Sequence, residues 1–169
     1  MPRAYKNGED LDAREKMHNA SCLAGMAFNQ ASLGINHSIA HALGGKFHIP
    51  HGRTNAILLP HVIEYNAGIV GYTNTEYSVS ARKYAEIASL LGIDFSNIRI
   101  GVRSLISEIV KLQKELKMST KLSQCNVSSS DIKKEEDEIA KLTIKDSCTK
   151  TNPKIPTEQD IKEILNKII

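Results

Sequence analysis

Residues 34–60 read GINHSIAHALGGKFHIPHGRTNAILLP. Four of the six histidines of the chain fall inside this stretch, namely His37, His41, His48 and His51. Its apolar residues recur at helical spacing, and the Gly44–Gly45 pair interrupts them. Glycine readily takes the left-handed conformation that ends helices. We therefore expect a helix over about residues 32–43, a loop over residues 46–50, and a second helix over about residues 52–66.

Helical spacing also dominates the rest of the chain, and no convincing run of alternating strand residues interrupts it. Further helices are expected at about residues 10–30, 78–91, 100–117, 131–142 and 157–169. Small side chains are frequent in the first of these, at Ala20, Ser21, Ala24, Gly25 and Ala27. Because small residues let helices approach closely, we expect this helix to be central and buried. The predicted fold class is all-α, a multi-helix bundle forming one domain of residues 1–169.

Local signals mark the helix ends and the loops. Asp10 can cap the first helix, and Ser128 with Asp131 and Thr157 with Asp160 have the spacing of capping boxes. Pro60 is expected to kink its helix. Loops are expected after residue 67, where Gly68, Gly71 and Asn74 lie, and over residues 119–130 and 145–156.

The composition is that of an ordinary globular protein. Apolar residues make up 41% of the 169 residues, enough to bury a core without disulfides. Basic and acidic side chains, 22 and 19 in number, are interspersed, so no nucleic-acid or membrane partner is indicated. Cys22, Cys125 and Cys148 are sparse, which favours free thiols in a reducing compartment. With no apolar leader after Met1 and no long apolar segment, we expect a cytoplasmic protein.

The histidine cluster is the chemical signal of the chain. His37 and His41 are four positions apart, so a helix places them on one face. A helix, a reversal and a second helix can bring His51 back beside His37, and imidazole nitrogen suits iron, zinc or nickel. Spacing alone is not decisive and also allows four ordinary core and surface histidines. The short zinc signature with Glu beside the first His is absent, since Ser38 follows His37. His18 and His61 are interpreted as structural.

Taken as a string, residues 34–60 resemble the signature of the iron-containing (group III) alcohol dehydrogenases. The likeness includes the helical His-x-x-x-His, the glycine pair, Pro-His-Gly and the Asn-Ala that follows. It extends upstream to AREKMHNAS at residues 13–21 and AGMAF at 24–28, and downstream to YNA at 65–67 and DSCTKTNP at 146–153. Residues 119–144 match least.

This resemblance implies the C-terminal helical, metal-binding domain of the dehydroquinate synthase-like and iron-containing alcohol dehydrogenase fold. The family holds Fe²⁺ or Zn²⁺ with an Asp and then three His. When the family's motifs are matched to this sequence, the last two of these four ligands correspond to His37 and His51. His41 matches a histidine near substrate and nicotinamide, which implies catalytic and cofactor-binding roles, whereas His48 matches a variable position and has no assigned role.

The remaining two ligands, and the α/β domain that binds NAD or NADP through a Gly-rich loop, have no match in this sequence. We therefore expect the first ligand helix and the nucleotide-binding domain to be absent. The resemblance implies part of an oxidoreductase that interconverts a small primary alcohol and an aldehyde, inactive as this chain alone and homo-oligomeric.

Two alternatives remain open. One is a metal- and NAD-dependent lyase of the dehydroquinate synthase-like superfamily. The other is a non-catalytic helical binding or oligomerisation module, which requires the rings of His37 and His51 to point apart. The separation of these two rings in the fold therefore distinguishes the metal hypothesis from the module.

Overall fold

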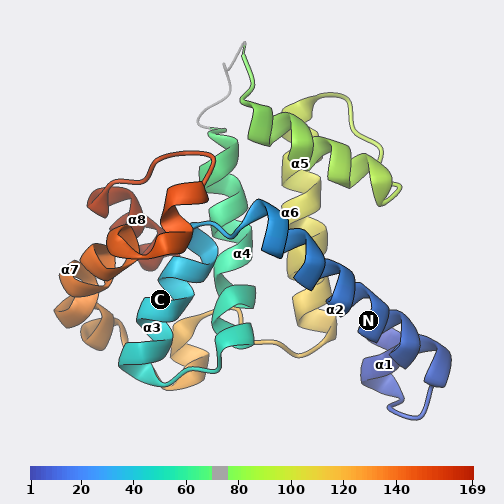
Figure 1. Cartoon of the computed structure of the whole chain (residues 1–169), viewed down its shortest axis with the longest axis horizontal. Coiled ribbons are helices and arrows are strands. Elements are labelled where there is room, and N and C mark those ends of the chain that lie inside the picture. The colour runs from blue at the N-terminus through green and yellow to red at the C-terminus, as the bar shows by residue number, and fades with distance from the viewer. Residues whose placement is uncertain (70–75) are drawn as a thin grey trace.

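The computed structural model describes residues 1–69 and 76–169, and all regular structure in them is helical (Figure 1). In chain order the elements are α1 (Pro2–Lys6), α2 (Leu11–Ala31), α3 (Ile35–Phe47), α4 (His51–Ala67), α5 (Val79–Leu90), α6 (Ile98–Glu115), the 3₁₀ helix η1 (Leu122–Cys125), α7 (Ser129–Lys145), the 3₁₀ helix η2 (Ser147–Thr151) and α8 (Glu158–Lys167). The all-α fold class expected from the sequence is confirmed.

Two hydrophobic clusters share α4. The larger lies between α3, α4, α7 and α8 and includes the fully buried Ile39, Leu58 and Leu165. The smaller joins α4 to α5 and α6 around Ala81 and Val102. Figure 1 shows the corresponding division, with α7 and α8 on one side of α4 and α5 and α6 on the other. The helix α4 is therefore the central element, and His51 is its first residue.

The helix starts follow from local capping. The side chain of Asp10 accepts a hydrogen bond from the Ala13 amide at the start of α2. Ser128 and Thr157 form complete capping boxes with the residues three positions later, at the starts of α7 and α8. All three caps predicted from the sequence are confirmed.

The glycine pair does not end α3, contrary to the sequence-based expectation. The helix continues through Gly44 and Gly45 to Phe47, and His48 ends it in the left-handed conformation at φ 53°. Lys46 in this last turn forms ion pairs with two carboxylates of α7, at 2.8 and 2.6 Å. These contacts, with the packing of Phe47 on the larger core, outweigh the weak helix propensity of glycine.

The expectation that the first helix is central and buried is wrong. In α2 only Ala13 is buried, whereas Leu23 and Phe28 are 66% and 50% exposed. Figure 1 shows α2 extending away from the body, with α1 beside its far end. Small residues permit another helix to approach, but among the described residues only the short α1 packs on this helix, at its far end.

The predicted loops are partly confirmed. Gly68, at φ 65°, ends α4, whereas Gly71 and Asn74 lie outside the described residues. The segments 119–130 and 145–156 contain η1 and η2. Pro60 lies buried inside α4. None of the helices in residues 1–69 and 76–169 combines the length and hydropathy that crossing a bilayer requires.

Candidate metal centre

Three histidine rings meet where α3 and α4 pack together. The ring centroids of His37 and His51 are 5.4 Å apart, and those of His41 and His51 are 5.3 Å apart. His37 and His41 lie on successive turns of α3, with their centroids 6.3 Å apart, and His51 is the first residue of α4. The structure thus brings together the three histidines that the sequence singled out. The non-catalytic module required the rings of His37 and His51 to point apart, and the structure instead places them side by side.

The corner between the helices positions His51. His48 takes the left-handed conformation, Ile49 is buried, and Pro50 occupies the N-cap of α4. Across this corner the Nδ2 of Asn36 on α3 donates to the side-chain oxygen and to the carbonyl of Asn55 on α4, at 2.7 and 3.2 Å. These bonds fix α3 against the first turns of α4.

Asn55 also orients the His51 ring. Its Nδ2 lies 3.0 Å from His51 Nε2 and 3.1 Å from the His51 carbonyl oxygen. Which of the two side chains donates in the contact with Nε2 depends on the tautomer of the His51 ring. Asn36 and Asn55 therefore act as positioning residues for the cluster. In the sequence, Asn55 contributed only as part of the Asn-Ala match, and Asn36 was not singled out.

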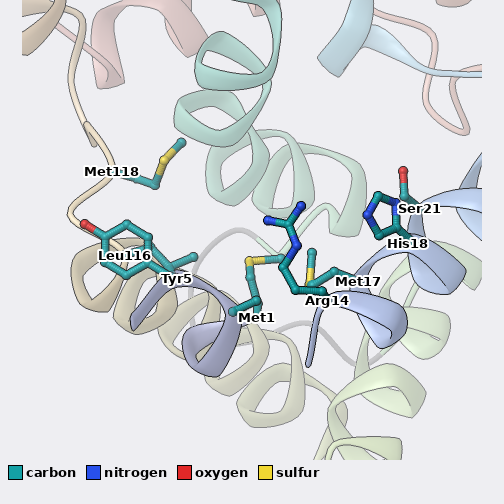
Figure 2. A pocket seen from close by; sticks show the side chains of 9 residues that line it. Met1, Tyr5, Arg14, Met17, His18, Ser21, Leu116 and Met118 are labelled. Carbon is teal, nitrogen blue, oxygen red and sulfur yellow. The ribbon is translucent and has the colours of Figure 1, made fainter. Parts of the chain in front are cut away.

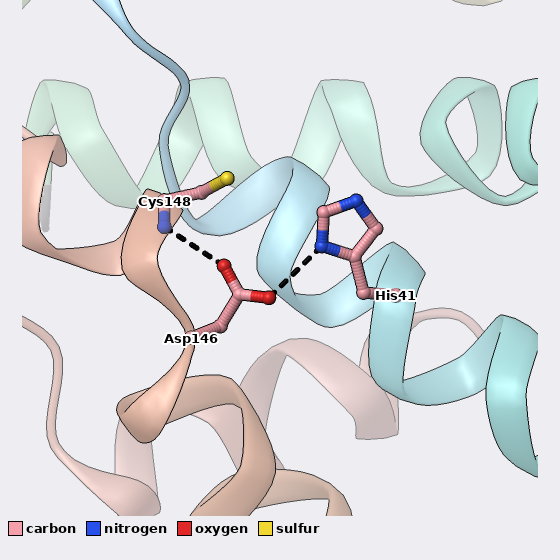
Figure 3. A group of neighbouring side chains, drawn as sticks. All are labelled: His41, Asp146 and Cys148. Carbon is pink, nitrogen blue, oxygen red and sulfur yellow. Dashed lines mark hydrogen bonds and ion pairs between the residues drawn. The ribbon is translucent and has the colours of Figure 1, made fainter.

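Asp146 holds the His41 ring in place through a hydrogen bond. Figure 3 shows this carboxylate between His41 and Cys148, with Oδ2 2.9 Å from His41 Nδ1. Its Oδ1 accepts hydrogen bonds from the Ser38 hydroxyl at 3.1 Å and from the Cys148 amide at 2.8 Å. Partial burial raises the pKa of Asp146, but the bonds from His41, Cys148 and Ser38 outweigh it and leave the pKa below its ordinary value.

The environment of His37 favours the neutral imidazole. Burial is the largest cause that lowers its pKa, followed by the neighbouring charges of His51 and His41, while Asp146 acts in the opposite direction. Neutral imidazole is the form that binds a metal ion. His37 is therefore favoured in the ligand-competent state, with the rings of His41 and His51 close to it.

The other histidines lie apart from this centre. His48 is exposed at the corner, and His61 is half-buried further along α4. His18, on α2, lines an open hollow of about 470 Å³ between α1, α2 and the residues that follow α6. Figure 2 shows it there beside Ser21, with Arg14, Met17 and Met1 nearby.

Sequence reasoning missed the part played by Asp146 and Cys148. The string DSCTKTNP at residues 146–153 contributed only to the resemblance, and its place beside the histidines was not predicted. The Asp-x-Cys spacing, with two donor types in three residues, is the signal that could have drawn attention to it.

Comparison with solved structures shows which known proteins share this fold. The chain superposes on 1,3-propanediol oxidoreductase with a TM-score of 0.87 and 34% identity, over 99% of this chain and 41% of that one. It superposes on an iron-containing alcohol dehydrogenase from Thermococcus thioreducens with a TM-score of 0.79 and 33% identity, over 94% of this chain and 38% of that one. The architecture is thus that of the helical part of alcohol dehydrogenases of this class.

Sequence comparison gives the family. Residues 1–169 match the family model described as "Fe-containing alcohol dehydrogenase family, C-terminal", so the chain belongs to this family and represents its C-terminal domain. It is 40% identical to an aldehyde-alcohol dehydrogenase of Streptococcus pneumoniae, over 98% of this chain and 19% of the relative. It is 39% identical to an NADPH-dependent butanol dehydrogenase of Clostridium saccharobutylicum, over 92% of this chain and 37% of the relative. The chain thus spans less than half the length of these relatives.

Proposed function

We propose that this chain is the metal-holding part of an oxidoreductase that interconverts a small primary alcohol and an aldehyde with NAD or NADP. The observation that carries the proposal is the 5.4 Å approach of the His37 and His51 rings at the α3–α4 corner. Family membership supports the reaction class, and the butanol dehydrogenase relative supports a short alcohol as substrate.

The donor set fits a divalent metal such as Fe²⁺ or Zn²⁺. His37 and His51 would hold it through imidazole nitrogens, which suit both ions. The Asp and the further His that the family uses are proposed to come from a helix outside residues 1–169. When bound, the metal supplies Lewis-acid polarisation of the alcohol or aldehyde oxygen. With two neutral ligands alone, the 169 residues are expected to bind it weakly.

His41 is proposed to accept or return the proton of the reaction. When Nδ1 donates to Asp146, the neutral ring carries its only ring proton there and Nε2 is left as an acceptor. The side chain is 45% exposed, so a substrate or a nicotinamide ring can reach it. A histidine held in one tautomer beside a reacting oxygen is suited to general acid–base catalysis.

The remaining proposals concern the nicotinamide cofactor, association with other subunits or domains, and location. NAD or NADP would be bound mainly outside these residues, and His41 would contact its nicotinamide end. The exposed apolar side chains of α2, among them Leu23 at 66% and Met26 at 62%, support association with other subunits or domains. The interspersed charge supports an enzyme without nucleic-acid or membrane partners, and the sparse free thiols support a cytoplasmic one.

A chimera tests this function. Residues 1–169 replace the matched segment of the Clostridium saccharobutylicum butanol dehydrogenase, and metal content and NADPH-dependent reduction of butanal are measured. We expect metal-dependent turnover by the chimera and none by residues 1–169 alone. His37→Ala and His51→Ala should remove the metal. His41→Ala should retain it but lower kcat by about 10²- to 10⁴-fold, the usual contribution of a proton-transfer group.

His18→Ala is the matched control, because this exposed histidine lies on α2 away from the cluster. It should leave metal content and turnover unchanged. A folded chimera that binds NADPH but whose activity survives both His37→Ala and His51→Ala would contradict the proposal.

A further inference from the structure

A second group of donor atoms converges beside the histidine pair. One ligand atom each from His41, Asp146 and Cys148 can be chosen such that all three lie within 4.8 Å of one another. They come from segments far apart in the sequence, since His41 lies on α3 and the other two residues lie where α7 leads into η2. Figure 3 shows the Asp146 carboxylate between the His41 ring and Cys148.

We propose that these three residues bind a Zn²⁺ ion through a His41 ring nitrogen, an Asp146 carboxylate oxygen and the Cys148 sulfur. This site shares His41 with the proposed proton transfer but uses neither His37 nor His51, so metal binding here can be tested separately from the proposed dehydrogenase metal centre. A mixed set of nitrogen, oxygen and sulfur donors is typical of zinc and unsuited to magnesium or calcium. Three protein ligands would leave one tetrahedral position open.

The scaffold holds these residues close to the required geometry. The buried Thr149 hydroxyl donates to Ser38 Oγ at 2.8 Å, and Ser38 in turn donates to Asp146 at 3.1 Å. These bonds fix η2 against α3. Zinc bonds of about 2.0 to 2.3 Å place tetrahedral donors roughly 3.3 to 3.8 Å apart. The three donor atoms already lie within 4.8 Å of one another, and binding through His41 Nδ1 and Asp146 Oδ2 would replace their 2.9 Å hydrogen bond with bonds to the ion.

Charge and access are also compatible with the ion. The side chains of His41 and Asp146 are 45% and 22% exposed, and Cys148 is a free, half-buried thiol. Binding releases the thiol proton to solvent, so that one carboxylate and one thiolate neutralise the two charges of the ion. The Asp146 bond to the Cys148 amide caps η2 and needs no cysteine side chain, so helix capping does not account for a thiol at this position.

Cobalt provides the test, because a thiolate bound to Co²⁺ gives a charge-transfer absorption in the near ultraviolet that imidazole and carboxylate ligands do not give. The reduced 169-residue chain is titrated with Co²⁺ and then with Zn²⁺. We expect this absorption to saturate at one ion per chain and to be removed by Zn²⁺. Cys148→Ser should abolish it and weaken Zn²⁺ binding by more than about 100-fold, beyond the usual loss for an outer contact.

Matched variants locate the ion. Cys125→Ser, which removes a comparable half-buried thiol in η1, and the double variant His37→Ala/His51→Ala should retain the absorption. Asp146→Asn keeps a side-chain oxygen that can cap η2 but should weaken Zn²⁺ binding. Circular dichroism and thermal unfolding establish that each variant is folded.

Two outcomes would overturn the proposal. One is the absence of the thiolate absorption in the wild-type chain, and the other is its persistence in folded Cys148→Ser. Cobalt binding that is lost in His37→Ala/His51→Ala but unaffected by Cys148→Ser would likewise reject this site, while supporting the metal centre of the proposed dehydrogenase.

Discussion

Asn66 on α4 and Asn152 after η2 exchange two side-chain hydrogen bonds, each Nδ2 donating to the Oδ1 of the other residue, at 3.3 and 2.8 Å. Both residues are buried. Asn152 also accepts from the Ile35 amide at the start of α3, at 3.2 Å, and donates to the Lys154 carbonyl at 2.6 Å. One amide group thereby joins the start of α3, the end of α4 and the segment leading to α8.

Removing this amide should destabilise the fold. We expect Asn152→Ala to lower the free energy of unfolding by about 2 to 3 kcal/mol, because it leaves the Asn66 side chain and the Ile35 amide buried without their partner. Urea denaturation measures the change, and a double-mutant cycle with Asn66→Ala should give a coupling of more than about 0.5 kcal/mol. Asn19→Ala, at an exposed position of α2, is the control; equal losses for the two alanine variants would refute this account.

Gly34 should tolerate no side chain. A Cβ at this position would lie 2.7 Å from Asn152 Oδ1, an atom held in place by the bonds just described. We expect Gly34→Ala to cost about 1 to 3 kcal/mol through overpacking. Gly45→Ala is the matched substitution inside α3, where a Cβ meets nothing within 4 Å. It should stabilise the helix by about 0.5 to 1 kcal/mol, and thermal unfolding that ranks the two variants the other way would contradict the packing.

His61 should make stability depend on pH. Burial and the charge of Lys167 lower its pKa, while Glu64 acts in the opposite direction. The unfolded chain therefore takes up a proton near the ordinary value of about 6.5, whereas the folded chain does so only at lower pH. Stability is fully present above that value and is lost as pH falls through the folded pKa.

The measurement is the urea midpoint between pH 7.5 and 5, in wild type and in His61→Gln. We expect the variant to lose part of the decline that wild type shows on acidification. His18→Gln makes the same change at an exposed site and serves as its control. Parallel pH profiles for wild type and His61→Gln would show that His61 does not contribute.

The capping box of α8 should contribute about 1 kcal/mol to the free energy of unfolding. Thr157 Oγ1 accepts from the Asp160 amide at 3.2 Å, and Asp160 Oδ2 accepts from the Thr157 amide at 2.8 Å. We expect Thr157→Ala to lower stability by about that amount, because the buried face of α8 depends on its first turn. Thr157→Ser keeps the hydroxyl and should retain most of it; comparable decreases in melting temperature for both variants would argue against the cap.

These caps were predictable because they depend on residues within one turn. Asp10, Ser128 and Thr157 each find their partner three positions later. The end of α3 was not predictable, because Lys46 binds carboxylates of α7 about ninety positions away. The burial of α2 was misjudged for a related reason. Small residues indicate that a helix can pack closely, but they do not show that a neighbouring helix is present.

In the candidate site, too, the local features were predictable from the sequence and the long-range contacts were not. Helical spacing alone put His37 and His41 on one face, and the reversal near Pro50 allowed His51 to join them. Asp146 lies 105 positions from His41, and no local pattern indicates a contact over that span. Long-range packing of α7 and η2 on α3 decides it.

The corner between α3 and α4 has a thermodynamic consequence. Only His48, Ile49 and Pro50 separate the two helices, and the pyrrolidine ring restricts φ at Pro50. The loss of chain entropy that brings the histidines together is therefore incurred during folding, not when an ion arrives. Cation affinity at this corner should accordingly follow the integrity of the core beneath it, so that a cavity at Leu58 would weaken ion uptake without altering any histidine.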